Sequence, residues 1–236
     1  DTNLEDANGR AIWALGYLIS ISNILPVQLT ADAASTMQTA LLNVTKIHST
    51  RAMAFIIKGL YYHNTKNKSP HHTLLITELA NRLVQMYRHE CDEEWQWFEG
   101  YLTYANSILS EAMLCAWLAT NSMVYKEIAQ SSFDFLLYKI FTEKTLNVIS
   151  NKTWLNKEDV ITPKINGGEQ PIDVAYTIIA LGKFYEVFKD EKIQGSGDIV
   201  KYKVHLVLKS NTSNYRASAD LIIVYHLDDK KWRIIE

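Results

Sequence analysis

The side chains best suited to chemistry in this sequence are four carboxylates close to apolar runs: Asp6, Glu111, Glu169 and Asp173. Two carboxyl groups that flank a glycosidic bond can act as acid and base, and a separation of roughly 5 Å or roughly 6.5–9.5 Å decides between retention and inversion. Glu111 is the strongest candidate for the proton donor, because apolar neighbours favour an uncharged carboxyl group. The alternative is that each carboxylate only caps or hydrogen-bonds a helix.

Aromatic and polar side chains near these carboxylates are suited to binding a sugar. Pyranose C–H faces stack on aromatic rings, and sugar hydroxyls need paired donors and acceptors. If Glu94–Leu114 is helical, Trp97, Tyr101 and Tyr104 fall at i, i+4 and i+7 on one stripe. The candidate substrate-binding residues are Arg10, Trp13, Arg51, Trp97, Tyr101, Tyr104, Asn106 and Gln170. The simpler alternative is an aromatic cluster that only packs helices together.

The runs that must position these residues are of two alternating kinds. Runs expected to be buried on all sides are Leu4–Ser22, Arg51–Tyr62, a helix pair within Glu94–Ala119, and Ile172–Leu181. Amphipathic runs lie between them at Thr30–Leu42, Thr73–Glu90 and Met123–Glu143. Two concentric layers of antiparallel helical hairpins would produce this alternation. The inner helices would then start at the same rim, and the polar residues near their starts would converge on one concave mouth.

The chain changes character after a boundary near Lys192–Gly197. Apolar and polar residues alternate with period two over Tyr202–Leu208 and Ala217–Tyr225, and Trp232–Ile235 follows a turn. We therefore predict a three-stranded antiparallel β-meander in residues 191–236, after a helical domain in residues 1–190. A ring with too few hairpins leaves apolar surface on its first and last buried helices. That surface is expected to pack on the sheet or to support self-association with a second chain.

Composition excludes several classes of partner. The 236 residues are 47% hydrophobic, carry a formal net charge of −2 and contain no long run of Lys or Arg, so neither nucleic acid nor a membrane is expected as a partner. Cys91 and Cys115 are the only cysteines. His71 with His72, and His89 with Cys91, could each supply two zinc ligands, but neither has a second pair at the spacing of a zinc site. No metal or cofactor is therefore expected. We expect a cytoplasmic protein. The start at Asp1, directly before a helix, leaves open whether upstream residues have been removed.

Four sequence blocks resemble a bacterial family of six-hairpin glycosidase-like proteins that accompany glycosyltransferases and mannan-processing enzymes. The blocks are Glu5–Gly16, Arg51–Phe55, Trp97–Asn106 and Glu169–Asp173. The resemblance covers roughly residues 1–190 and implies an (α/α) toroid with carbohydrate as the substrate class. Family members carry a further block on each side, so this chain resembles an incomplete member. The C-terminal strands look weakly like the closing strands of a cystatin-like or nuclear-transport-factor-2-like cone.

The expected fold is therefore mainly α, a partial (α/α) toroid of antiparallel hairpins followed by a small β-meander. The resemblance implies a carbohydrate-active protein, a hydrolase-like enzyme that acts on an oligosaccharide or polysaccharide with a carboxylate acid/base pair in a concave aromatic cleft. The alternative is a noncatalytic carbohydrate-binding or scaffolding protein, which the missing flanking blocks favour.

Overall fold

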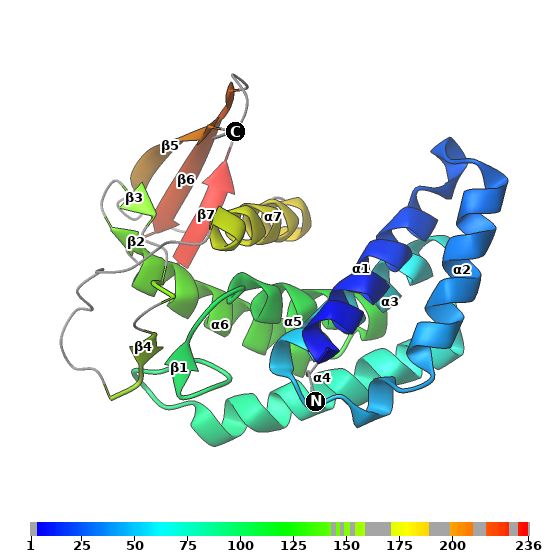
Figure 1. The fold of residues 1–236 in the computed structure, drawn as a ribbon. Helices are drawn as coiled ribbons and strands as arrows, with labels where there is room; N and C mark the ends of the chain where they lie inside the picture. Colours follow the sequence, from blue (N-terminus) through cyan, green and yellow to red (C-terminus); the bar gives the residue numbers. More distant parts are fainter. Residues whose placement is uncertain are drawn as a thin grey trace.

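The computed structural model describes residues 4–142, 145–146, 149–151, 154–158, 171–188, 199–209, 216–226 and 231–235. Within these residues the chain is mainly helical, as predicted (Figure 1). The α-helices are α1 (Glu5–Ser20), α2 (Val27–Leu41), α3 (Thr50–Lys66), α4 (Pro70–Glu90), α5 (Ser107–Thr120), α6 (Met123–Ile140) and α7 (Pro171–Phe188). Short 3-10 helices, η1 (Ser22–Ile24) and η2 (Val44–Lys46), follow α1 and α2.

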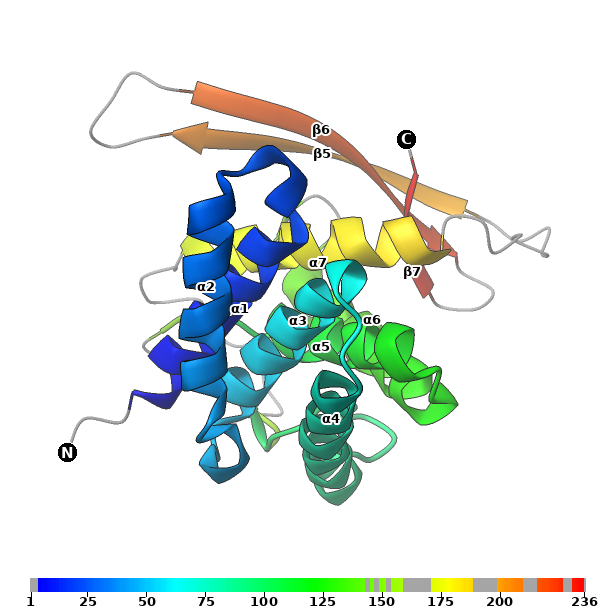
Figure 2. The same cartoon turned by 90° about the vertical axis from the view of Figure 1, so that its right-hand side faces the viewer.

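The helices form an inner and an outer set. The odd-numbered helices α1, α3, α5 and α7 contact one another in chain order, and α2, α4 and α6 each pack against the helix that precedes them (Figure 1, Figure 2). Every residue of 50–60 in α3 and of 107–116 in α5 is buried, whereas α2 buries only Ala33 and Met37. The predicted alternation of buried and amphipathic helices is thus present at the centre of the array.

The prediction that the first helix is buried on all sides is wrong. In α1 only Gly9, Ile12, Gly16 and Ile19 are buried, and Tyr17 is 50% exposed. The reason is position, because α1 stands at the end of the inner set and most of its contacts with other helices are with α3 and α2. At the other end of the set, Ile179 of α7 is 41% exposed. Ile172 of α7 is 37% exposed as well, so the prediction of burial on all sides is also wrong for Ile172–Leu181.

Glycine allows α1 and α3 to approach closely. A Cβ atom added at Gly16 would lie 2.0 Å from the carbonyl oxygen of Gly59, and one added at Gly59 would lie 2.5 Å from the carbonyl oxygen of Ile12. These neighbours are backbone atoms, which cannot rotate away as a flexible side chain can. A side chain at either position must therefore push the two helices apart.

We expect Gly16→Ala to lower the free energy of unfolding by about 3 kcal/mol, at the upper end of the range for overpacking. The matched control is Gly182→Ala in α7, where an added Cβ has no neighbour within 4 Å. That change should raise stability by about 0.5–1 kcal/mol, because alanine is the better helix former. Denaturant unfolding of both variants tests this pair, and equal effects would contradict the close contact.

The segment between α4 and α5 is not the helix predicted for Glu94–Asn106. It is a loop whose two-residue strand β1 (Tyr101–Leu102) pairs antiparallel with β4 (Leu155–Asn156). The Asp92 carboxylate accepts hydrogen bonds from the backbone N–H groups of Glu94 and Trp95, at 2.9 and 2.8 Å. Such local side-chain bonds compete with helical ones. The predicted aromatic stripe therefore does not form.

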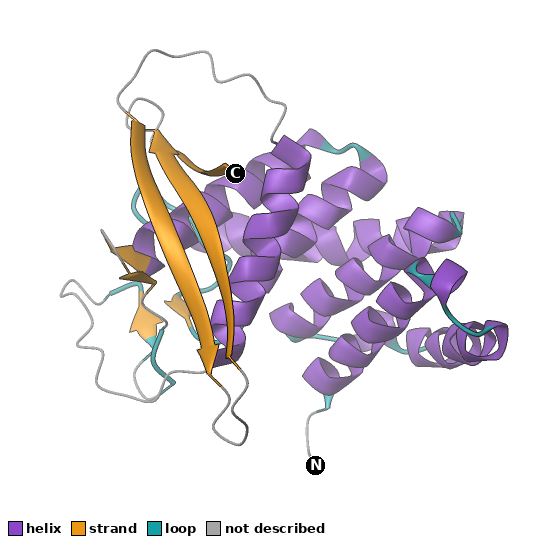
Figure 3. Ribbon diagram, turned by 90° about the horizontal axis from the view of Figure 1, so that it is seen from above, coloured by secondary structure: helices purple, strands orange, loops and turns teal. Residues whose placement is uncertain are grey.

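Two further sheets lie after α6. The strands β2 (Phe141–Thr142) and β3 (Thr145–Leu146) pair with each other, and β5 (Ile199–Lys209), β6 (Arg216–His226) and β7 (Lys231–Ile235) pair antiparallel in chain order. The register places Val204 opposite Leu221 and Ile223 opposite Ile234. Figure 3 shows β5 and β6 as long adjacent arrows at one side of the helices, and β7 contacts α7 and α6. The C-terminal strands therefore adjoin the end of the inner set that α7 forms.

Candidate functional site

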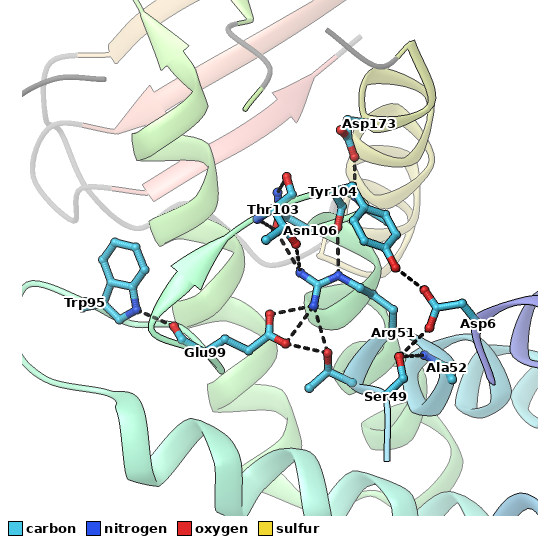
Figure 4. A network of polar contacts seen from close by, with 12 residues as sticks. Asp6, Ser49, Arg51, Ala52, Trp95, Glu99, Thr103, Tyr104, Asn106 and Asp173 are labelled. Carbon is cyan, nitrogen blue, oxygen red and sulfur yellow. Dashed lines mark hydrogen bonds and ion pairs between the residues drawn. The ribbon is translucent and has the colours of Figure 1, made fainter. Parts of the chain in front are cut away.

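The starts of the four inner helices meet at one place (Figure 4). Asp6 lies in the first turn of α1, Arg51 is the second residue of α3, Asn106 directly precedes α5, and Asp173 lies in the first turn of α7. Hydrogen bonds connect all four through the 99–106 loop. The Tyr104 hydroxyl donates to Asp6, and the backbone N–H of Ala105 donates to Asp173. Four of the polar residues predicted to converge, Asp6, Arg51, Asn106 and Asp173, are thus joined in one hydrogen-bonded network.

Arg51 is the centre of a structural network that holds this loop. Its Nη1 lies 2.6 Å from Glu99 Oε2, its Nη2 donates to Thr103 Oγ1 at 2.7 Å, and its Nε donates to the Tyr104 carbonyl at 3.0 Å. Asn106 Oδ1 accepts from the Thr103 N–H at 3.0 Å. Arg51 and Asn106 were predicted to bind substrate, but in this structure protein groups occupy most of their hydrogen-bonding capacity. Sequence reasoning missed Glu99, although it stands one residue before the glycine of the Glu-Gly-Tyr block.

Asp6 is held between α3 and the loop. Its carboxylate accepts hydrogen bonds from the Ser49 hydroxyl and from the Tyr104 hydroxyl. Burial, and then the hydrogen bond to Asp6, raise the pKa of Tyr104 to about 12. Tyr104 therefore remains a hydrogen-bond donor near neutral pH, and Asp6 remains its acceptor.

Asp173 has the properties expected of a proton donor. Burial raises the pKa of this carboxyl group, and the Ala105 N–H and the nearby charge of Arg51 oppose that shift only in part. One carboxyl oxygen, Oδ1, accepts the Ala105 N–H, whereas Oδ2 is buried and has no hydrogen-bond partner among the described residues. A carboxyl group in this state can hold a proton and present it to a ligand.

Aromatic rings lie beside Asp173, between α1, α3 and α7. The Trp13 ring stacks on Phe55 with centroids 5.6 Å apart, and Tyr176 lies 5.9 Å from Trp13 and 5.8 Å from Phe55. The Arg10 guanidinium lies over the Phe55 ring, 5.2 Å from its centroid. Arg10 and Trp13 were predicted as binding residues. Phe55 and Tyr176 were not, because in the sequence they look like ordinary core positions.

Glu111 has a buried cationic partner. Lys58 Nζ lies 2.6 Å from Glu111 Oε2, and both side chains are fully buried. Lys58 Nζ also lies 4.0 Å from the centroid of the Trp13 ring. Glu111 was predicted as the strongest candidate for the proton donor, and the sequence analysis did not identify Lys58 as its partner. A signal was present, since Lys58 interrupts an apolar run seven residues after Arg51 and therefore lies on the same face of α3.

The remaining predicted residues lie elsewhere. Trp97 is fully buried and packs edge-on against Phe98, with centroids 5.4 Å apart. Tyr101 is 38% exposed and lies 5.5 Å from Trp154, away from the other candidates. The single stripe of Trp97, Tyr101 and Tyr104 is thus a wrong prediction, because the segment that carries them is a loop. Glu169 and Gln170 lie outside the described residues.

The described part of the chain offers no candidate cluster for metal binding and no candidate helix for crossing a membrane. No cluster of three or more His, Cys, Asp or Glu residues there could hold a metal ion. None of the described helices has the length and hydropathy needed to cross a membrane. Comparison of the sequence with protein-family models and with curated proteins, and of the fold with solved structures, finds no match.

Proposed function

We propose that this chain is a carbohydrate-active protein that binds an oligosaccharide where its inner helices start, on the concave side of a partial (α/α) toroid. One observation carries the proposal. Six buried side-chain atoms have no hydrogen-bond partner among the described residues: Arg10 Nε, Trp13 Nε1, Trp97 Nε1, Ser107 Oγ, Glu111 Oε1 and Asp173 Oδ2. Three of these six belong to residues in or beside the ring cluster of Trp13, Phe55 and Tyr176, namely Arg10, Trp13 and Asp173. Buried polar groups are nearly always hydrogen-bonded. Sugar hydroxyls would supply the missing partners, and the rings would contact the sugar faces.

The chemistry that fits this site is acid-assisted cleavage of a glycosidic bond. Asp173 would donate the proton to the leaving oxygen, since burial favours its protonated form. Asp6 would be the second carboxylate. Asp6 accepts a hydrogen bond from Tyr104 and Asp173 accepts one from the next residue, Ala105, so both carboxyl groups contact the same short loop. Glu111 is less suited to the role because its charge is paired with Lys58.

A second candidate function is noncatalytic sugar binding. The observation that favours it is that the carboxylates of Asp6 and Glu111 already have protein partners. Asp6 accepts two protein hydroxyls, and Glu111 is paired with a buried ammonium group. If neither carboxylate can act as base or nucleophile, the rings and the unpartnered donors would still bind a sugar, and nothing would be cleaved.

The deciding experiment uses Asp173→Asn with a panel of mannan, glucan and acidic oligosaccharides. If the protein is an enzyme, the variant should release sugar about 10²–10⁴-fold more slowly, while its affinity for the oligosaccharide changes little. Wild-type activity should fall as pH rises through the raised pKa of Asp173, because the acid form is then lost. The matched control is Asp32→Asn, an exposed position on α2 that should leave activity unchanged.

The outcomes separate the candidates. Equal activity of Asp173→Asn and the wild type would remove Asp173 from the mechanism. Calorimetric binding without any turnover by the wild type would establish the noncatalytic function. Absence of both binding and turnover across the panel would remove carbohydrate as the ligand class and leave the ring cluster as packing.

A further inference from the structure

Arg10, which is half-buried, differs from the buried cations Arg51 and Lys58 in having no carboxylate partner among the described residues. Arg51 and Lys58 each lie 2.6 Å from a carboxylate oxygen. Arg10 makes no hydrogen bond or ion pair with any described residue, and its Nε is buried. Its guanidinium rests on the Phe55 ring at 5.2 Å from the centroid, which holds it in place from one side.

Asp6, the acidic residue one turn before Arg10 on α1, forms no ion pair with Arg10 in the structure. Asp6 precedes Arg10 by four residues, so the two lie on the same face of the helix. However, the carboxylate of Asp6 accepts the hydroxyls of Ser49 and Tyr104, which lie on other segments. A partly buried guanidinium without an anion is costly, because its desolvation is not offset by a counter-charge. An anion from outside the described residues would complete this arrangement.

Several groups of the candidate site can donate a hydrogen bond to a ligand. Trp13, three residues further along α1, has an unpartnered indole N–H and packs on the same Phe55 ring. Ser107 has an almost completely buried hydroxyl without a hydrogen-bond partner among the described residues. Asp173 Oδ2 is likewise buried without a partner there, and burial raises the pKa of this carboxyl group. The Tyr176 hydroxyl lies close enough to Arg10 for the positive charge to lower its pKa against the effect of burial. A site rich in donors fits a ligand group rich in acceptors.

We propose that the sugar bound at this site carries a carboxylate, as a hexuronic acid does, and that Arg10 binds that carboxylate. This inference rests on the proposed function, which it narrows to an acidic sugar. A monoanion matches one guanidinium that has no ion-pair partner within the part of the chain that the structure describes. A phosphate dianion beside Asp6 would need a second cation, and Arg51 and Lys58 already have carboxylate partners. The planar guanidinium also offers two parallel N–H donors to the two oxygens of a carboxylate.

The test is calorimetry with oligosaccharides of glucuronate, galacturonate and mannuronate, each beside the same oligosaccharide with its carboxyl groups reduced to alcohols. The wild type should bind at least one acidic form about tenfold or more tightly than its reduced counterpart. Arg10→Gln should weaken binding of that acidic form by on the order of 10- to 100-fold and change the reduced form by less than about threefold. Arg10→Lys should retain part of the preference, since it keeps the charge and loses the planar fork.

The matched control is Arg88→Gln, an exposed arginine in the last turn of α4, which should leave both affinities unchanged. If the wild type binds reduced and acidic forms equally, or if Arg10→Gln keeps the acidic preference, the inference is overturned and the sugar site remains. A preference for a sugar phosphate over every uronate would also overturn it. If the wild type binds none of these oligosaccharides, charged or neutral, the proposed function itself fails.

Discussion

Replacing Lys58 by methionine is expected to lower the free energy of unfolding by about 3–5 kcal/mol, because the change leaves the fully buried carboxylate of Glu111 without its counter-charge. No water can compensate directly, since both side chains are inaccessible to solvent. In a chain of this length the loss corresponds to a decrease of on the order of 10 °C in melting temperature. Differential scanning calorimetry would measure it, provided that unfolding is reversible.

Two controls separate lost pairing from lost packing. Lys66→Met changes an exposed lysine in the last turn of the same helix and should stay within about 0.5 kcal/mol of the wild type. The double variant Lys58→Met with Glu111→Leu removes both charges and should recover most of the lost stability, since apolar replacements of buried ion pairs are often neutral or better. A double variant less stable than Lys58→Met alone would show that the pair contributes through something other than mutual neutralisation.

The helices at the centre of the array could be predicted from the sequence, because an uninterrupted run of apolar residues indicates a helix that is buried on all sides. Residues 52–57 and 112–116 are apolar without interruption, and both runs are helical and buried. The segment Glu94–Asn106 could not be predicted in the same way. Its aromatic residues at helical spacing are equally compatible with a loop that buries Trp97 and pairs Tyr101 with a distant strand residue, Asn156. Tertiary contacts, which a single sequence does not show, decided between the two.

In the candidate site, too, some residues could be predicted from the sequence and others only from tertiary contacts. Asp6, Asn106 and Asp173 could be predicted to meet, because polar residues at the starts of successive inner helices lie at one end of the array. The residues that were missed, Lys58 and Tyr176 among them, are defined by partners on other helices. Lys58 is read in the sequence as one polar residue in an apolar run, and only the packing of α3 against α5 shows that it neutralises a carboxylate.

Arg51→Met is the second large effect expected, a loss of about 3–5 kcal/mol in the free energy of unfolding, because Glu99 would keep a largely buried charge without a cation. Arg51→Lys keeps the charge but cannot reach Glu99, Thr103 and the Tyr104 carbonyl together, so about 1–3 kcal/mol should be lost. Arg88→Met, at an exposed position, is the matched control. Denaturant titration measures all three, and Arg51→Met as stable as Arg88→Met would contradict the role of the network.

The same variants decide whether Arg51 binds sugar, as its position in the sequence suggested, or only holds the loop. The backbone N–H groups of Thr103 and Ala105 donate to Asn106 and Asp173, so their hydrogen exchange reports the order of the loop. If Arg51 only holds the loop, sugar affinity and amide protection should fall together in Arg51→Met and return together, in part, in Arg51→Lys. Loss of affinity in Arg51→Lys with the protection of both amides intact would instead show direct contact with the ligand. Tyr104 and Ala105 are the loop residues that donate hydrogen bonds to Asp6 and Asp173. If affinity and amide protection fall and return together, Arg51 therefore also holds these two proposed catalytic carboxyl groups in place, through the loop and without touching the ligand.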